Sequence, residues 1–294
     1  MVQGKDKLIL VGGATGYLGK YVVKELKEQG YRVRALARSA DKLGGAKQFA
    51  DEVFIGEATK PETLTGLLDG VDTVITSLGI TRQTDKVTYD DVDYLANKRL
   101  MDMAEEAGVR RFIYVASLNA HHVEFTDMVA AKEKAVRALK STKMEWVVVR
   151  PGAFFVDMNE FLDMAKGGCV FYFGDGKTEV NPIHGADLAA VCVKCVDGES
   201  NIELPCGGPE VFSWQQIASL AFQACEKKQF TVGIPLWVME LLVLPALKLL
   251  SRRWWNIAAF MSGAGKYDMK APQHGQRRLG TFFKETMAGE KVGL

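Results

Sequence analysis

Residues 8–19 read LILVGGATGYLG, and this stretch decides the fold. A short apolar run leads directly into glycines spaced Gly13-x-x-Gly16-x-x-Gly19, and an amphipathic helical pattern follows from Tyr17 to Gln29. Glycines at this spacing permit a tight turn, a close backbone approach to a pyrophosphate and close packing of the helix on the strand. The first turn of the helix then offers free N–H groups to phosphates. We expect a dinucleotide-binding turn made of Gly13, Ala14, Thr15, Gly16, Tyr17, Leu18 and Gly19.

Short β-branched runs alternate with helical patterns through the first half of the chain. The strand candidates, in chain order, are KLILV, RVRALA, EVFIG, TVITS, FIYVA and WVVV. This alternation predicts repeated βαβ units, and therefore an α/β Rossmann fold with a doubly wound parallel sheet.

After Pro151 the alternation gives way to Gly-rich and aromatic segments. A helix from about Asp187, a strand near IELP and a helix from about Ser213 are expected there. We predict a Rossmann core of residues 1–155, with residues 183–206 completing the sheet. The remaining segments, 156–182 and 207–294, are expected to form a smaller substrate-side cap.

The composition is that of an ordinary globular protein, with 48% hydrophobic and 25% charged residues. The net charge of +1 argues against nucleic acid as a partner. Five cysteines without framework spacing predict reduced thiols. Cys192 and Cys195 form a CxxC, but no second pair follows at zinc-site spacing, so we favour a helix with both sulfurs buried over a metal or redox site. No metal is expected.

The chain begins MVQGKDK, which leaves no room for a secretory or organellar leader before the first strand candidate. We therefore expect a cytoplasmic or organelle-stromal protein.

The end of the second strand candidate bears on the choice between NAD and NADP. It reads Ala37-Arg38-Ser39, where an acidic residue would bind the ribose 2′-hydroxyl of NAD. Arg38 can instead bind a 2′-phosphate, with Ser39 beside it and Lys42 one turn further on. A solvated surface role for Arg38 is the alternative. We predict NADP(H), with further contacts from the carboxyl ends of the strands at Glu57, Ala58, Ser77, Leu78, Gly79, Ala116, Pro151, Gly152 and Phe154.

These segments together resemble the atypical or extended short-chain dehydrogenase/reductases. That family includes NmrA-like regulators, isoflavone-reductase-like enzymes, an accessory subunit of complex I and the divinyl chlorophyllide 8-vinyl reductase branch. The resemblance covers nearly the whole chain. Its landmarks are VGGATGYLG, DVDYLANKRLMDMAEEAGVRRFIYVAS, AAKEKAV, WVVVRPGAFF and NPIHGADLA. The order of RPGAFF, FGDGK, PIHGADLAA, CGGPE, IPLWVMELL and LGTFFKE is most similar to the vinyl reductase branch.

The resemblance implies catalytic positions, and the chain departs from one of them. The family's Tyr-x-x-x-Lys pair corresponds to Met128 and Lys132, and its serine corresponds to Ser117. Methionine cannot donate a proton, which argues against ordinary ketone reduction. A conjugated alkene accepts hydride at one carbon and delocalises the charge, so Lys132 could act electrostatically while steadying the nicotinamide ribose. A solvated surface role for Lys132 is the alternative.

Several other side chains have two interpretations. His121 or His122 could replace the missing acid, or could serve only in the loop. His184 is assigned a structural role, before a helix that we expect Asp187 to cap. The aromatic residues could stack on a planar ligand or form ordinary core; they are Phe154, Phe155, Phe171, Tyr172 and Phe173.

The apolar segment from Ile234 to Leu250 is too short and too interrupted to span a membrane. We favour a buried or capping helix kinked at Pro245 over an interfacial helix that touches a membrane or a partner subunit through residues 234–260.

The resemblance implies an NADPH-dependent reductase acting on a hydrophobic conjugated alkene or carbonyl substrate. The alternative is an NADP(H)-binding protein without turnover, serving as a regulator or as an accessory subunit of a membrane complex.

Overall fold

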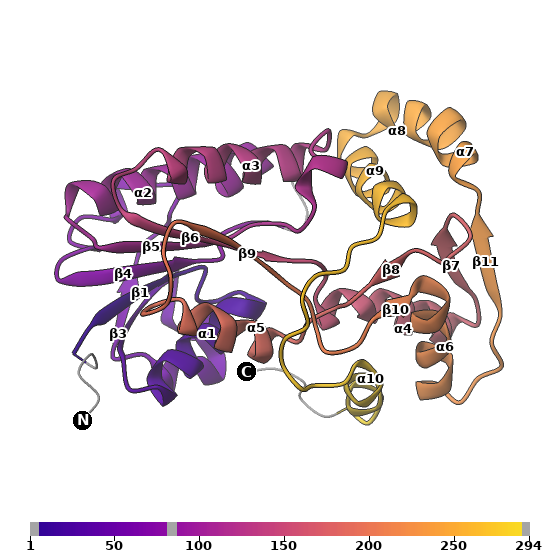
Figure 1. Ribbon diagram of the computed structural model, residues 1–294, viewed down its shortest axis with the longest axis horizontal. Helices are drawn as coiled ribbons and strands as arrows, with labels where there is room; N and C mark the ends of the chain where they lie inside the picture. Colours follow the sequence, from indigo (N-terminus) through magenta and orange to yellow (C-terminus); the bar gives the residue numbers. More distant parts are fainter. Residues whose placement is uncertain (1–5, 81–86, 290–294) are drawn as a thin grey trace.

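The computed structural model describes residues 6–80 and 87–289. A seven-stranded parallel sheet in the order β3-β2-β1-β4-β5-β6-β9 forms its larger part (Figure 1). The strands are β1 (Leu8–Gly12), β2 (Arg32–Ala37), β3 (Glu52–Ile55), β4 (Val71–Thr76), β5 (Arg111–Val115), β6 (Glu145–Pro151) and β9 (Ile202–Cys206). The six strands predicted from the first half are all present, and the expected Rossmann α/β fold is confirmed. Residues 1–5, which begin the segment used for the leader prediction, lie outside the described residues.

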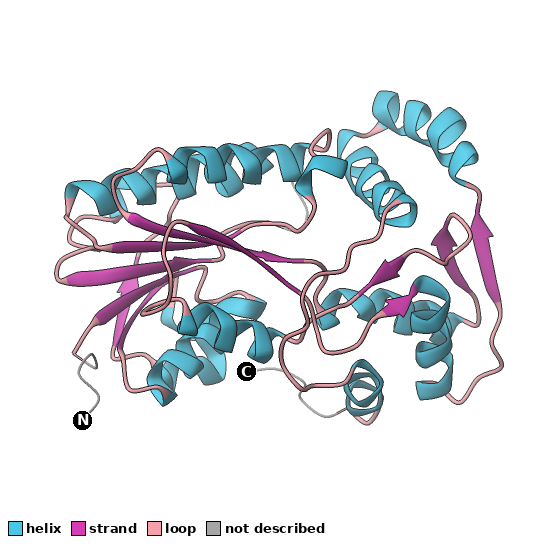
Figure 2. Cartoon of the chain, in the orientation of Figure 1, coloured by secondary structure: helices cyan, strands magenta, loops and turns pink. Residues whose placement is uncertain are grey.

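Helices cover both faces of the sheet (Figure 2). Strand β1 shows why, since its alternate side chains enter different cores. Ile9 and Val11 pack with α1 (Tyr17–Glu28), η1 (Ala40–Phe49) and α5 (Gly185–Lys194). Leu8 and Leu10 pack on the other face, with α2 (Asn97–Glu106) and α3 (Asp127–Lys140). A π-helical turn, η3 (Asp90–Ala96), runs directly into α2, and short turns η2 (Pro61–Thr63) and η4 (Ala120–His122) lie in loops.

A second set of elements lies beyond the carboxyl end of the sheet, and most of them pack around a separate apolar core (Figure 1). Its helices are η5 (Phe155–Met158), α4 (Asn159–Gly167), α6 (Trp214–Ala224), α7 (Leu236–Val238), η6 (Met239–Val243), α8 (Leu244–Leu250), α9 (Arg252–Lys266) and α10 (Leu279–Met287). Its strands are β7 (Val170–Phe173) and β11 (Thr231–Ile234), which pair in parallel, and β8 (Glu179–Val180) and β10 (Phe212–Ser213), which pair antiparallel.

An extended strap, residues 267–278, runs from α9 back across the carboxyl ends of β6 and β9 to α10 (Figure 1). Asn181, which is fully buried, accepts from the Ala271 N–H at 3.0 Å and donates to the Ala271 carbonyl at 2.8 Å. Further along, Asp187 accepts from the N–H groups of Gln276 and Arg277 and pairs with the Arg277 guanidinium. These contacts fasten the strap to the elements that flank the sheet.

Helix α5 begins differently from the expectation. Asp187 was expected to cap it, but the cap is His184, whose Nδ1 accepts from the Ala186 N–H at 3.1 Å. Asp187 lies inside the first turn and binds the strap instead. The prediction that both CxxC sulfurs are buried is confirmed: Cys192 is buried on this helix, and Cys195 is buried directly after its last residue, as the C-cap. Burial raises the pKa of the Cys195 thiol to about 11.

The apolar segment also departs from the expectation. Ile234 ends strand β11, and a helix runs from Leu236 to Leu250 through the π-helical turn η6 just before Pro245. The favoured buried position is wrong, because Leu249 is 89% and Leu250 81% exposed. Among the described residues no helix combines the length and the apolar character needed to cross a bilayer.

Candidate dinucleotide-binding site

The glycine-rich turn joins β1 to α1 in the centre of the sheet, where the strand order reverses between β1 and β4. Gly13 has φ +77°, which favours glycine, and a Cβ there would lie 3.1 Å from the Leu78 amide nitrogen. A Cβ on Gly19 would overlap the Gly13 carbonyl oxygen, so α1 can pack this closely only through a glycine. No side chain caps α1 at Gly16. The first-turn N–H groups are thus left for an anion, and this cradle fits a dinucleotide pyrophosphate.

Tyr17, in the first turn of α1, contacts the start of α5. The Gly185 N–H donates to the Tyr17 hydroxyl at 3.0 Å, and the ring makes edge contacts with Tyr21 and Phe154. Burial raises the pKa of the Tyr17 phenol above its usual value. Phe154, a predicted cofactor contact, therefore packs on the side chain of the phosphate-binding turn.

The residues predicted to select NADP lie at the end of β2. Arg38 and Lys42 are exposed, and Ser39 is half-buried. Hydrogen bonds from Lys60 and Thr59 lower the pKa of the Glu57 carboxyl, and the charge of Arg38 contributes in the same direction. The end of β2 therefore combines two exposed cations with a nearby carboxylate that stays ionised.

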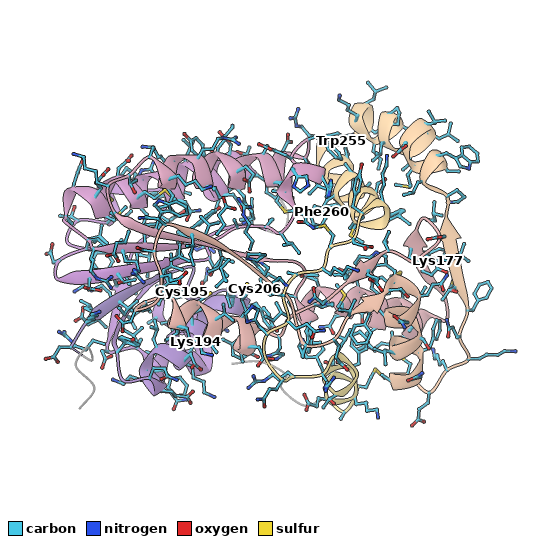
Figure 3. All side chains as sticks on the ribbon, in the orientation of Figure 1. Lys177, Lys194, Cys195, Cys206, Trp255 and Phe260 are labelled. Carbon is cyan, nitrogen blue, oxygen red and sulfur yellow. The ribbon has the colours of Figure 1, made fainter. Side chains whose placement is uncertain are left out.

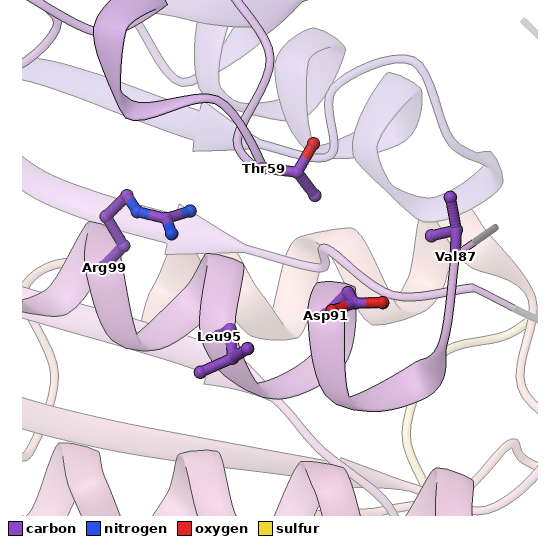
Figure 4. A pocket seen from close by; sticks show the side chains of 5 residues that line it. All are labelled: Thr59, Val87, Asp91, Leu95 and Arg99. Carbon is purple, nitrogen blue, oxygen red and sulfur yellow. The ribbon is translucent and has the colours of Figure 1, made fainter.

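A pocket of about 230 Å³ opens beside the end of β3 (Figure 4). Thr59 lines it from the loop after β3, and Leu95 and Arg99 line it from the helices η3 and α2, with Val87 and Asp91 completing it. Arg99 donates to the carbonyl of Ala58 at 2.9 Å, which joins this pocket to a predicted cofactor contact. None of the predicted catalytic residues lines this pocket.

Lys132 lies at the same edge of the sheet, in an ion pair that the sequence did not predict. Its Nζ is 2.8 Å from Oδ1 of Asp93, which is fully buried, while the Lys132 side chain remains 16% exposed. Burial is the largest single influence and would lower the pKa of Lys132. The charge and hydrogen bond of Asp93, together with the charges of Tyr114 and Glu133, outweigh burial, and the pKa is raised. A Cβ on Gly79 would lie 3.0 Å from the same Nζ. The surface role considered for Lys132 is therefore wrong.

Asn97 holds Asp93 and the loop after β4 in place. Its Oδ1 accepts from the Thr76 hydroxyl at 3.0 Å, and its amide donates to the carbonyls of Leu78 and Asp93 at 3.1 Å each. Asp93 in turn accepts from the Ile80 N–H at 3.1 Å. The π-helical turn η3 carries Asp93 and leads into Asn97, so this irregular turn places Asp93 against Lys132 and Asn97 beneath the loop after β4.

Ser117 and its neighbours follow β5. The Ser117 carbonyl accepts from Arg150 of β6 at 2.8 Å, and Arg150 also forms a bidentate pair with Glu133 of α3. Ala116 and Pro151 are buried, and each takes part in backbone pairing between the β5 and β6 ends. The strap covers Gly152, where a Cβ would lie 3.1 Å from the Met269 carbonyl oxygen.

Beyond Ser117 the two histidines have different surroundings. His121 is exposed, with its ring centroid 3.9 Å from that of His122. His122 stacks on Tyr267 of the strap at 4.1 Å with nearly parallel rings. Met128, at the position of the family's tyrosine, packs in a small apolar cluster with Val123 and with Phe260 of α9, which Figure 3 labels.

The other aromatic residues considered for ligand stacking do not gather at one site. Phe155 is buried core, and Phe171 is exposed on β7. Tyr172 and Phe173 are half-buried, with Tyr172 against Gly176 and Phe173 against Gly265. Sequence reasoning also missed three parts of the site: Asp93, Asn97 and Tyr267. The described residues contain no cluster of three metal-ligating side chains.

Comparisons with known proteins agree with this geometry. The sequence profile of an NAD(P)H-binding family matches residues 13–199. The divinyl chlorophyllide a 8-vinyl-reductase of Zea mays is 28% identical over 99% of this chain and 83% of its own length. The photosystem II assembly factor Ycf39 of Guillardia theta is 25% identical over 79% of this chain and 74% of its own length. The NADPH-dependent quinone oxidoreductase of Escherichia coli, solved with NADPH, superposes with a TM-score of 0.74 at 16% identity, covering 96% of this chain and 99% of that one.

Proposed function

The chain belongs to the NAD(P)H-binding family, and from this premise we propose that it is an NADPH-dependent reductase of a hydrophobic conjugated alkene or carbonyl compound. The observation that carries the proposal is the Lys132–Asp93 pair. It places a partly exposed ammonium beside Gly79, at the edge of the sheet that also carries the phosphate-binding turn. Ligands of open α/β sheets bind in this position, outside the carboxyl ends of the strands where their order reverses.

The preference for NADPH over NADH rests on the end of β2. Arg38 and Lys42 are both exposed there, and the residues directly after the strand are Arg38 and Ser39 rather than a carboxylate that would bind a ribose 2′-hydroxyl. An arginine can bind a 2′-phosphate through two parallel hydrogen bonds. We expect NADPH to bind at least about tenfold more tightly than NADH, and Arg38→Ala to remove most of that difference. Equal dissociation constants for the two nucleotides in the unmodified protein would contradict the assignment.

The chemistry follows from which side chains can act. A bound NADPH would supply the hydride. Lys132 provides a fixed positive charge toward the electron-rich product of hydride addition, and Asp93 keeps that ammonium protonated and oriented. Met128 has no proton to give, so a substrate that delocalises its charge and takes its proton from water suits this site best. His122, which stacks on Tyr267, directly precedes Val123 of the Met128 cluster.

The substrate class is supported from two directions. The Zea mays relative is named for a vinyl group conjugated to a tetrapyrrole, and the Escherichia coli structure is named for a quinone. Both compounds accept a hydride into an extended conjugated system. We therefore propose that conjugated alkenes and quinone-like carbonyls are better substrates than isolated ketones.

The test is NADPH oxidation, followed at the nicotinamide absorbance, with a panel of enones, quinones and divinyl tetrapyrroles. Lys132→Ala should lower kcat at least about tenfold because it removes a charge near the reacting atoms. Lys134→Ala is the matched control, since Lys134 lies on the same helix with 47% of its side chain exposed and an outward pair with Asp90. Equal loss in both variants, or no loss in either, would contradict the role of Lys132.

One observation favours a second candidate function. Met128 replaces the family's tyrosine, and it packs against Val123 and Phe260 of α9. A protein that binds NADP(H) without turnover, as a regulator or assembly subunit, could fill this position with apolar contacts. Tight NADPH binding without oxidation by any compound of the panel would support this second function.

A further inference from the structure

The segment 236–266 forms a helical hairpin, in which α7, η6 and α8 make the outer arm and α9 makes the inner arm (Figure 1). The outer arm lies at a corner of the molecule, away from the sheet. Its large apolar side chains are unusually exposed: Trp237 60%, Leu241 69%, Leu242 59%, Leu249 89% and Leu250 81%. Isolated exposed leucines are ordinary, but several on one element mark a contact surface.

The exposed residues form one stripe along the outer arm. They form two neighbouring series in which every fourth residue is exposed: residues 237, 241, 245 and 249, and residues 242, 246 and 250. In an ordinary α-helix such a series would drift around the axis, because a turn holds fewer than four residues. The wider turn of η6 slows the drift and keeps the series on one side. The inward side is marked by Met239, which is buried.

Ion pairs and hydrogen bonds join the hairpin to the rest of the molecule, so its apolar side chains are exposed on a fixed element. Arg252 makes a bidentate pair with Asp127 at the start of α3, at 2.7 Å for both contacts. The buried Asn256 binds the Asp127 carboxylate and accepts from its N–H at 2.8 Å. Lys266 pairs with Glu240 at 3.1 Å and joins the two arms.

Basic residues outnumber acidic residues in the hairpin, although Arg252 is paired with Asp127 and Lys266 with Glu240. Residues 236–266 contain Lys248, Arg252, Arg253 and Lys266 against the single acidic residue Glu240. Lys248 is exposed between the apolar pairs of the stripe, with its Nζ 5.8 Å from the Trp255 ring. Helices that lie in a membrane interface typically have exposed leucine and tryptophan side chains next to basic residues.

We propose that this stripe docks the protein on an anionic lipid surface, with the apolar side chains entering the interface and Lys248 meeting the headgroups. The positive charge argues for an anionic occupant and against a second copy of the chain. A two-fold interface would place the stripe on itself and bring the excess basic residues of two hairpins together. The stripe is too short to span a bilayer, so the contact is peripheral.

The test is co-sedimentation of the full chain with vesicles of phosphatidylcholine containing about 30% phosphatidylglycerol, compared with pure phosphatidylcholine. We expect stronger binding to the anionic vesicles, weakened when NaCl rises from about 0.1 to 0.5 M. The double variant Leu249→Ser, Leu250→Ser should bind them at least about tenfold more weakly. Lys248→Glu should lose several-fold on the anionic vesicles alone.

The matched control is Phe230→Ser, which removes an apolar side chain of 60% exposure outside the hairpin and should leave vesicle binding unchanged. An unchanged dissociation constant for NADPH shows that each variant is folded, and it makes this test independent of the reductase proposal. Three results would overturn the proposal: no binding to vesicles, equal binding to both compositions, or binding that the leucine variant leaves intact. A dimer in sedimentation velocity that the leucine variant dissolves would identify a second copy as the occupant instead.

Discussion

Acidification should destabilise this protein through His184. The imidazole is 7% exposed and lies among the rings of Tyr21, Phe155 and Phe282, with centroids 5.2, 5.6 and 6.0 Å away. Its Nδ1 caps α5 by accepting from the Ala186 N–H, which a protonated nitrogen cannot do. Burial, assisted by the charge of Arg277, lowers the pKa of His184 from its usual 6.5 to about 4.

The sign and size of the effect follow from these two values. The unfolded chain binds a proton near pH 6.5 and the folded protein only near pH 4, so the stability from neutral His184 is present above pH 6.5 and is lost as the pH falls toward 4. Between pH 7 and pH 5 this residue alone should remove about 2 kcal/mol from the free energy of unfolding.

The assay is urea unfolding at a series of pH values, for the unmodified protein and for His184→Asn. Asparagine is a good N-cap and does not titrate, so the variant keeps the cap and loses the proton linkage. All other titrating groups are shared, and the difference between the two pH profiles isolates His184. If the two profiles run parallel from pH 7 to pH 5, the argument from burial and capping is wrong.

Three further predictions rest on contacts across the fold. Asp93→Asn should lower the free energy of unfolding by about 3–5 kcal/mol, because it leaves the Lys132 ammonium without its counter-charge. A double-mutant cycle with Lys132→Met should show strong coupling between the two residues, and additive effects would contradict the ion pair. Gly19→Ala should weaken NADPH binding by about tenfold or more in a fluorescence titration, because its methyl group displaces the phosphate-binding turn; unchanged affinity would contradict the cradle. Asn181→Ala should lower the free energy of unfolding in urea by about 2–4 kcal/mol, because it leaves buried backbone groups unpaired. It should also raise the rate of amide hydrogen exchange along residues 267–278, and exchange equal to that of the unmodified protein would contradict the proposal that Asn181 holds the strap.

The nucleotide end of the site could be predicted from local sequence alone. The turn from β1 to α1 is specified by neighbouring residues, because Gly13, Gly16 and Gly19 meet one another within a single βα unit. The catalytic end could be predicted only in part. Lys132 was found by its resemblance to a family pattern, whereas its partner Asp93 comes from a π-helical turn that no local spacing indicated.

His184 and Asp187 show the same division. The sequence indicated a helix start near both residues and predicted Asp187 as its cap, but which side chain caps a helix depends on what else each side chain can reach. The strap comes from a distant part of the chain, and its N–H groups donate to the Asp187 carboxylate. That carboxylate is therefore engaged, and His184 caps the helix.

The sequence by itself determined the Rossmann class, the six strands of its first half and the phosphate-binding turn, since periodicity and glycine spacing act between near neighbours. Tertiary structure alone decided which polar groups meet at Lys132, how the strap closes over Gly152, and that the apolar stripe from Trp237 to Leu250 faces outward. The physical reason is that burial and ion pairing depend on what the rest of the chain brings to a side chain, and an apolar helix carries no local signal of whether anything will cover it.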